Sequence, residues 1–216
     1  MRIRPGPLLC ELHAHSRWSD GLLTIGQLVD VYGKNGFDVL CVTDHTVRDD
    51  DPWRGYDGWV DRSVGPETWP AYLAEVEREA SRARAQYGML VIPGLELTYN
   101  DVEPDEAAHA VAIGLRQFVS VDGGIAEAID TAAEAGAALV AAHPYDGEPP
   151  SHRTRLTQRF AHDLELCGLV HRFEHLIGWK TLVPSALNET ALVEYLRSRR
   201  PVYLARLEAD TPRLAA

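Results

Sequence analysis

Short apolar runs alternate with longer amphipathic stretches along the first two thirds of the chain. Runs rich in Val, Ile, Leu and Ala predict strands over residues 7–12, 39–43, 89–93, 108–115 and 137–142. Apolar positions at helical spacing, each series followed by a glycine, predict helices over residues 24–35, 69–86 and 124–135. This alternation of strand and helix predicts an α/β fold built on a mostly parallel sheet.

Two stretches interrupt the alternation. Residues 46–68 hold many Asp, Trp, Gly and Pro residues without periodicity, which predicts a long loop that could cover a site. In the last third, residues 156–166 and 189–199 have helical spacing, no strand is evident between them, and residues 201–207 form a late strand candidate. No repeat or shift in composition divides the chain, so we expect a single domain over residues 1–216.

Composition and charge narrow the class of protein. Hydrophobic residues make up 45% of the chain and charged residues 25%, which is close to soluble globular chains and argues against disorder and against a membrane protein. Neither a leader pattern nor an apolar run of roughly 18 residues is present, so we expect a cytoplasmic location. The formal net charge of -11 argues against wrapping a nucleic-acid duplex, because such binding needs a basic surface.

Side chains that can bind a metal gather where the predicted strands end. In chain order these positions are held by His13, His15, Asp44, His45, Glu96 and His143. Loops after the carboxyl ends of parallel strands converge on one face, so we expect these residues to meet in space. His109 differs, because it stands at the start of the fourth run, where this rule does not place it.

The residue types predict a site for divalent metals. His, Asp and Glu suit zinc, manganese and iron, and alternation along a strand puts His13 and His15 on one side, so the pair could share a metal. A carboxylate such as Glu96 can bridge two metals, as in two-metal hydrolases. If Asp20 and Glu96 are the anionic ligands, two or three divalent ions make the pocket cationic and attract an anionic phosphate ester.

Several short segments, taken together, resemble the PHP family, named for polymerase and histidinol phosphatase domains. The matching segments are Glu-Leu-His-Ala-His-Ser at 11–16, Ser-Asp-Gly at 19–21, Val-Thr-Asp-His at 42–45, Pro-Gly-Leu-Glu-Leu-Thr at 93–98, His109, and Ala-His-Pro at 142–144. The resemblance implies a distorted (β/α)7 barrel that holds two or three divalent metals, Zn, Mn or Fe, and hydrolyses phosphoesters.

The resemblance also implies a set of metal ligands. His13, His15 and Glu96 would hold a first metal, and Glu96, His109 and His143 a second. A third metal would use Asp20 and His45, although an Asp before Gly21 is also a common turn residue. Asp44 is expected to orient a ligand rather than to bind metal.

Arginines after the Ala-His-Pro segment are candidates for substrate binding. Arg153 and Arg155 could clamp a phosphate, although surface arginine is the simpler interpretation. Three further histidines, His152, His162 and His175, fall outside the family pattern and are expected to have no role in the site.

The last third departs from the family pattern. Family members end with a strand that carries an Asp-x-His pair, whereas this chain reads Leu169-Val170-His171. A strand and a helix deleted before His171 would explain this, and the barrel would then be short by about one βα unit near residues 168–172. His171 would remain a candidate ligand of the third metal, and a second copy of the chain could cover the exposed edge.

These features predict a metal-dependent phosphoesterase that acts on a phosphorylated small molecule or nucleotide by attack of a metal-bound hydroxide. Because the Asp is missing, a degenerate protein that binds metal or a phosphorylated ligand without catalysis is the alternative. Metal-dependent hydrolysis of a carbon–nitrogen bond is a third candidate.

Overall fold

The computed structural model describes residues 8–56, 58, 60–144, 158–174, 181–183 and 188–198. Its strands are β1 (Leu8–Ala14), β2 (Val39–Val42), β3 (His45–Val47), β4 (Leu90–Tyr99), β5 (Ala108–Ile113), β6 (Ala138–Ala141), β7 (Arg172–Phe173) and β8 (Thr181–Val183). Its helices are α1 (Ile25–Lys34), α2 (Trp69–Tyr87), α3 (Ile125–Glu134), α5 (Leu164–Leu169) and α6 (Glu189–Arg197), with short 3-10 turns at Val60–Arg62 and Gln158–Ala161.

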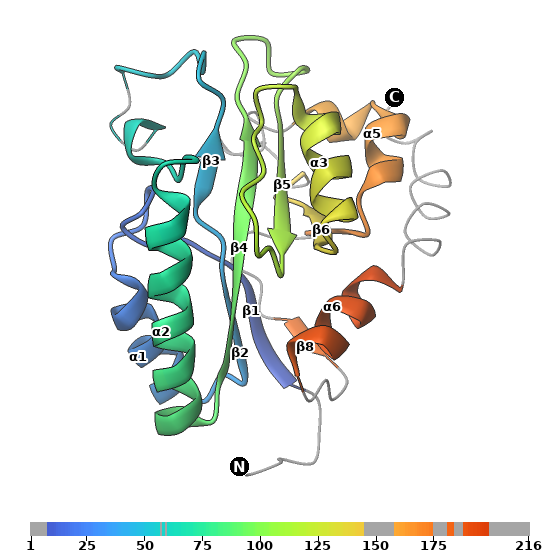
Figure 1. Cartoon of the computed structure of the whole chain (residues 1–216). Coiled ribbons are helices and arrows are strands. Elements are labelled where there is room, and N and C mark those ends of the chain that lie inside the picture. The colour runs from blue at the N-terminus through green and yellow to red at the C-terminus, as the bar shows by residue number, and fades with distance from the viewer. Residues whose placement is uncertain are drawn as a thin grey trace.

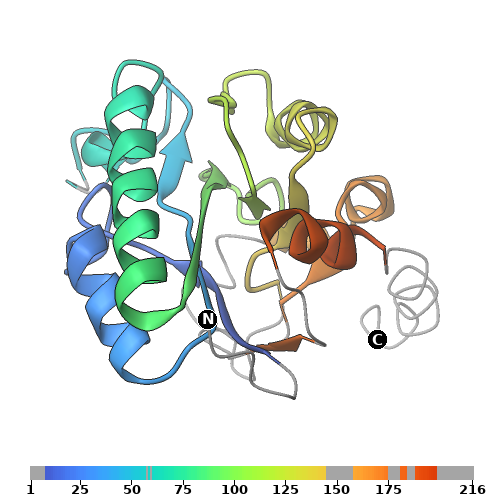
Figure 2. The ribbon, with the colours of Figure 1, turned by 60° about the horizontal axis from the view of Figure 1, so that its bottom comes forward.

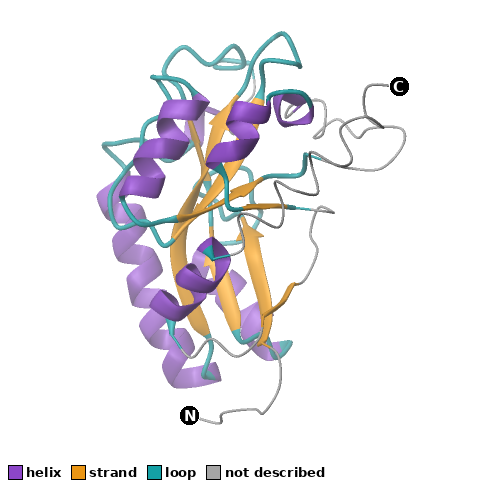
Figure 3. Ribbon diagram, turned by 90° about the vertical axis from the view of Figure 1, so that its right-hand side faces the viewer, coloured by secondary structure: helices purple, strands orange, loops and turns teal. Residues whose placement is uncertain are grey.

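The strands form one curled sheet in the order β7-β6-β5-β4-β2-β1-β8, and β3 pairs with the far part of β4. Helices α1 and α2 lie together against one half of the sheet, and α3, α5 and α6 lie beside the other half (Figures 1 and 2). Seen from the side, the strand direction turns strongly from one end of the sheet to the other (Figure 3). This α/β architecture is a distorted, partly closed barrel.

The expectation of a mostly parallel sheet is correct only for part of it. The pairs β1–β2, β2–β4, β3–β4 and β6–β7 are parallel, but β5 runs antiparallel to both β4 and β6, and β8 runs antiparallel to β1. The connection between β4 and β5 is short, residues 100–107, whereas a parallel crossover needs a dozen or more residues. Consequently the start of β5 lies at the same end of the sheet as the carboxyl ends of its neighbours β4 and β6.

The predicted helices and strands of the first two thirds are confirmed to within a few residues, except that the strand predicted over 89–93 continues to Tyr99. Thr24 caps α1 through a reciprocal pair of hydrogen bonds with Gln27, and α2 ends at Gly88 in the left-handed conformation, with φ of 69°. Apolar side chains of α1, α2 and α3 form the larger core against the sheet. A smaller core joins Leu192 and Leu196 of α6 to inner positions of β1, β2 and β5.

The C-terminal third differs from its prediction. The helix expected over 156–166 is replaced, from residue 158 on, by a 3-10 turn and the separate helix α5, because the Asp163 side chain accepts the N–H of Leu166 and starts a new helix. Two short strands, β7 and β8, stand where no strand was expected. The loop over 46–68 also contains β3 and a 3-10 turn. The strand candidate over 201–207 lies outside the described residues. The deletion near residues 168–172 stays a prediction, as does the second copy of the chain that could cover the exposed sheet edge.

None of the described helices is long and apolar enough to cross a membrane.

Candidate metal centre

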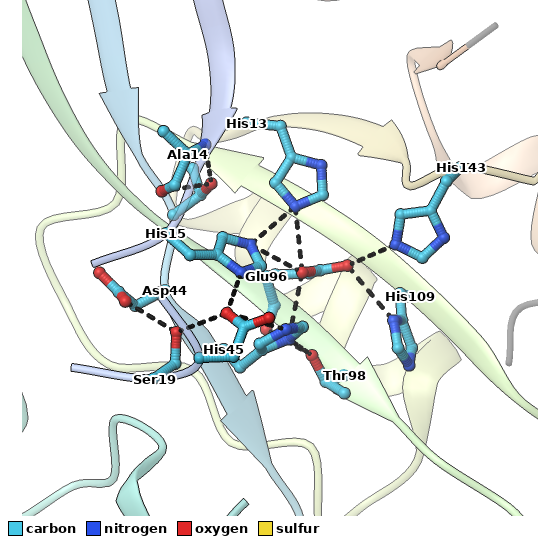
Figure 4. Close-up of polar contacts among 12 residues, drawn as sticks. His13, Ala14, His15, Ser19, Asp44, His45, Glu96, Thr98, His109 and His143 are labelled. Atoms are coloured by element: carbon cyan, nitrogen blue, oxygen red, sulfur yellow. Dashed lines mark hydrogen bonds and ion pairs between the residues drawn. The ribbon is translucent and has the colours of Figure 1, made fainter. Parts of the chain in front are cut away.

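The Glu96 carboxylate lies at the centre of five histidine rings (Figure 4). Its side chain is fully buried on β4, where Glu96 pairs in register with His45 of β3 and Val111 of β5. The rings around it belong to His13, His15, His45, His109 and His143. The structure therefore brings together residues that lie up to 130 positions apart in the sequence, as their places at strand ends predicted for all of them except His109.

The first ligand group consists of His13, His15 and Glu96. The Nε2 atoms of His13 and His15 lie 2.8 Å apart, and each lies 3.0 Å from Oε2 of Glu96. His13 lies in β1 and His15 directly follows it, and the pairing of β1 with β2 is irregular between Glu11 and Ala14. Three atoms that can donate a lone pair thus converge on one point.

A carboxylate stands behind each of these two rings. Nδ1 of His13 lies 2.9 Å from Oε1 of Glu174, and Nδ1 of His15 lies 2.5 Å from Oδ1 of Asp20. A carboxylate can only accept, so each Nδ1 carries the proton, and in neutral rings each Nε2 then presents a lone pair to the other. Two such lone pairs facing each other repel unless a cation lies between them, so this donor set fits a divalent metal.

Without metal, the electrostatics of the group favour protonated rings. Burial lowers the pKa of His13, but Glu174 and Glu96 raise it well above its ordinary value. Burial likewise lowers the pKa of His15, and hydrogen bonds with Asp20 and Glu96 raise it to about 9. Burial raises the pKa of Glu96, but the surrounding histidines bring it well below its ordinary value. These shifts favour a proton on Nε2 of each ring, which a metal would have to displace.

The second ligand group consists of Glu96, His109 and His143. Oε1 of Glu96 lies 3.3 Å from Nδ1 of His109 and 3.2 Å from Nε2 of His143. His109 reaches the site because β5 is antiparallel, so the start of this strand lies at the carboxyl ends of the others. The reversed strand explains why His109 lies at the site although the parallel-strand rule does not place it there.

A buried hydrogen-bond chain fixes the orientation of His109. Nδ2 of Asn100 donates to Oδ2 of Asp51 at 2.9 Å, which turns Oδ1 of Asn100 toward Nε2 of His109 at 3.0 Å. Nε2 of His109 therefore carries the proton, and Nδ1 keeps its lone pair. Within the described part of the chain this buried Nδ1 has no hydrogen-bond partner, as expected of an atom placed for a metal.

The third group combines His15, Asp20 and His45. Nε2 of His45 lies 3.8 Å from Oδ1 of Asp20, while its Nδ1 lies 2.6 Å from Oγ1 of Thr98. Burial lowers the pKa of His45 to about 4, so the ring is neutral and can act as a ligand. This group shares His15 with the first group, and Asp20 contacts the other nitrogen of the same ring.

Asp44 holds the loop that carries the candidate ligands His15 and Asp20, and lies in none of the three groups. Its carboxylate accepts the N–H and the hydroxyl of Ser16 at 2.8 Å each, and the hydroxyl of Ser19 at 2.7 Å. The loop also needs Gly21, because a Cβ there would lie 2.3 Å from the carbonyl oxygen of His15. This placement supports an orienting role for Asp44.

The structure does not bring His171 to the centre. It immediately precedes β7, and its Nδ1 accepts the backbone N–H of Leu139 at 3.0 Å, so among the described groups it joins none that could hold a metal. Glu174, three residues later, reaches the site instead. His162 contacts the carbonyl oxygen of Asp105, away from the cluster. Arg153, Arg155, His152 and His175 lie outside the described residues.

Sequence reasoning missed Glu174, Asn100 and Asp51. Glu174 follows a strand of two residues, which is too short to show a period. Asn100 directly follows β4, and a residue just after a strand is a candidate for the site. The predicted strand ended at residue 93, so this signal was lost. Asp51 lies in the long loop, where no pattern separates one Asp from another.

Comparisons with known proteins find one family and similar solved structures. The PHP domain family matches residues 11–203. A solved two-domain protein from Bacteroides vulgatus ATCC 8482, which contains a predicted PHP-like metal-dependent phosphoesterase, is 22% identical with a TM-score of 0.50 over 77% of this chain. The matched part is 43% of that protein. A proposed metal-dependent phosphoesterase from Bifidobacterium adolescentis ATCC 15703 is 15% identical, with a TM-score of 0.43 over 92% of this chain and 84% of its own.

A comparison with curated proteins gives no match. The family match covers most of the chain and includes every residue of the three ligand groups. The chain belongs to the PHP domain family.

Proposed function

We propose that the protein is a metal-dependent phosphoesterase that hydrolyses a phosphate ester of a small molecule or nucleotide. The observation that carries the proposal is the set of three adjoining ligand groups around one buried carboxylate, Glu96. Adjoining groups of this kind suit a multinuclear centre of zinc, manganese or iron, whereas a single structural metal would need only one closed set of ligands.

The charge of the site supports an anionic substrate. Two or three divalent ions bring four to six positive charges, and three carboxylates, Asp20, Glu96 and Glu174, offset part of them. The filled pocket would remain cationic within a chain whose formal net charge is -11. Bound metals of this kind supply an activated water and stabilise charge on phosphoryl oxygens.

The chain's own residues place and orient that chemistry. Glu96 joins the first two groups by offering one oxygen to each. Asn100 sets the tautomer of His109, and Asp44 fixes the loop with His15 and Asp20. Arg153 and Arg155 remain proposed contacts for the phosphate.

Metal loading followed by an activity assay tests the proposal. Protein loaded with manganese or zinc should hydrolyse a generic phosphomonoester or a nucleotide, and His13→Ala should abolish turnover. His162→Ala is the matched control, because it removes an exposed histidine outside the cluster. Bound metal without turnover across a broad phosphoester panel would contradict the proposal.

A noncatalytic protein is the second candidate, and the absent Asp-x-His pair favours it. It predicts fewer than two metals per chain and binding of a phosphorylated ligand without product. Elemental analysis together with the same panel separates the two functions. Hydrolysis of a carbon–nitrogen bond would be recognised by release of an amine instead of inorganic phosphate.

A further inference from the structure

Glu174 touches two histidines that belong to different ligand groups. Its Oε1 lies 2.9 Å from Nδ1 of His13, and its Oε2 accepts the backbone N–H of His143 at 2.8 Å. The Glu174 side chain is 16% exposed, so water competes little for these contacts. One carboxylate thus connects the end of β1 to the residue beyond β6.

The contact with His143 supports an uncommon backbone conformation. His143 has φ of 34°, and within the described residues it is the sole non-glycine residue with positive φ. This region costs a residue with a side chain about 1 kcal/mol or more, so neighbouring contacts must maintain it. In this conformation, Nε2 of His143 lies 3.2 Å from Glu96. The Glu174 acceptor therefore helps to hold the ring at the second group.

The contact with His13 acts through the ring. Glu174 meets Nδ1, while the atoms of the first group, in His15 and Glu96, meet Nε2 on the opposite side. Glu174 is consequently placed to orient His13 and not to bind the metal that Nε2 faces. A carboxylate behind a histidine ligand fixes its tautomer and raises its basicity.

We infer that Glu174 is the positioning carboxylate of the metal centre, holding His13 and His143 from behind. It supplies a negative charge in a chain that lacks the Asp of the Asp-x-His pair, and it does so without adding a ligand. The first group then keeps three protein ligands, which leaves coordination positions open for water and substrate. The inference rests on the metal binding in the proposed function, but not on the phosphoesterase reaction.

Replacing Glu174 with glutamine tests the inference. Gln keeps the volume but offers one acceptor oxygen, so it cannot accept from both histidines. Zinc titration of Glu174→Gln, followed by equilibrium dialysis, should give the same number of metals as the unchanged protein with roughly 10- to 100-fold weaker affinity. The absorption spectrum of the cobalt-loaded protein should keep its band positions, because no ligand is exchanged.

Two results would overturn the inference. An affinity within about twofold of the unchanged protein would show that Glu174 positions nothing, and loss of one whole metal would make it a ligand. Glu77→Gln, an exposed carboxylate on α2, is the control and should bind zinc normally. If Glu174→Gln does not fold, Glu174→Asp, which keeps the charge but is too short to reach both histidines, enters the same titration with the same outcomes. Absence of zinc binding by the unchanged protein would instead contradict the proposed function.

Discussion

Asn100→Ala should weaken the second metal group and the fold together, because Asn100 connects them. Its amide bridges the Asp51 carboxylate in the long loop to Nε2 of His109. All three side chains are buried, with exposed fractions of 4% for Asp51, 1% for Asn100 and 2% for His109. Alanine removes both hydrogen bonds and leaves a buried carboxylate oxygen and a buried ring N–H without their partner.

The expected magnitude follows from these two contacts. A net loss of about 1 kcal/mol per hydrogen bond, plus the desolvation of the groups left behind, lowers the free energy of unfolding by about 3 kcal/mol. For a chain of 216 residues, this lowers the melting temperature of the metal-free protein by roughly 6 to 12 °C. The freed His109 ring can also take the wrong tautomer, which weakens metal affinity roughly 10- to 100-fold.

Thermal unfolding without metal and a zinc titration measure the two effects separately. Asn35→Ala is the control, because Asn35 is also a hydrogen-bonded asparagine but lies at the exposed end of α1. Its melting temperature should change by no more than about 2 °C, with normal metal binding. If Asn100→Ala bound every metal with unchanged affinity, Nδ1 of His109 would not be a ligand atom oriented by the Asp51–Asn100 hydrogen bonds.

Three further predictions concern the same centre. Gly21→Ala should reduce metal binding at the group of His15, Asp20 and His45, because the added Cβ would meet the carbonyl oxygen of His15. Equilibrium dialysis measures the loss. Unchanged binding would contradict the close packing of Gly21 against His15. Zinc binding at pH 7 should release protons, and affinity should rise with pH toward about 9, since the raised pKa values of His13 and His15 keep both rings protonated without metal. Calorimetry in two buffers of different ionisation enthalpy detects this release, and equal heats would exclude it. Removal of metal by a chelator should lower the unfolding free energy by about 3 kcal/mol for each bound metal, relative to protein in free metal at about one hundred times the dissociation constant. Thermal unfolding with and without chelator measures this loss, and an unchanged melting temperature would contradict it.

Much of the fold in the first two thirds follows from local periodicity. The helices α1, α2 and α3 show apolar positions at a helical period, and Thr24 and Gly88 mark helix ends through their own chemistry. The candidate ligands His13, His15 and Glu96 could be found because they follow predicted strand ends or fit a known order of motifs. The information for these features lies within a few residues of each.

The remainder depends on contacts between distant segments. The direction of β5 is set by its pairing with β4 and β6, so no local pattern identifies His109 as lying at the site edge. β7 has two residues and β8 three, which is too few for a period of two to be visible. His171 matched a motif by type, but its strand places it beside Leu139. Because β7 is so short, the position of Glu174 at the site can be recognised only from the structure.

The three carboxylates of the centre come from different parts of the chain and have different contacts. We therefore expect different changes to affect the number of bound metals and the affinity for them. Glu96 is fixed within the long strand β4, and every residue of the three ligand groups lies between positions 13 and 143. Asp20 and Glu174 stand behind ligand rings, and only Glu174 comes from the C-terminal third. Because the described residues of that third contribute orientation and join none of the three groups, changes among them should weaken metal binding before they reduce the number of metals bound.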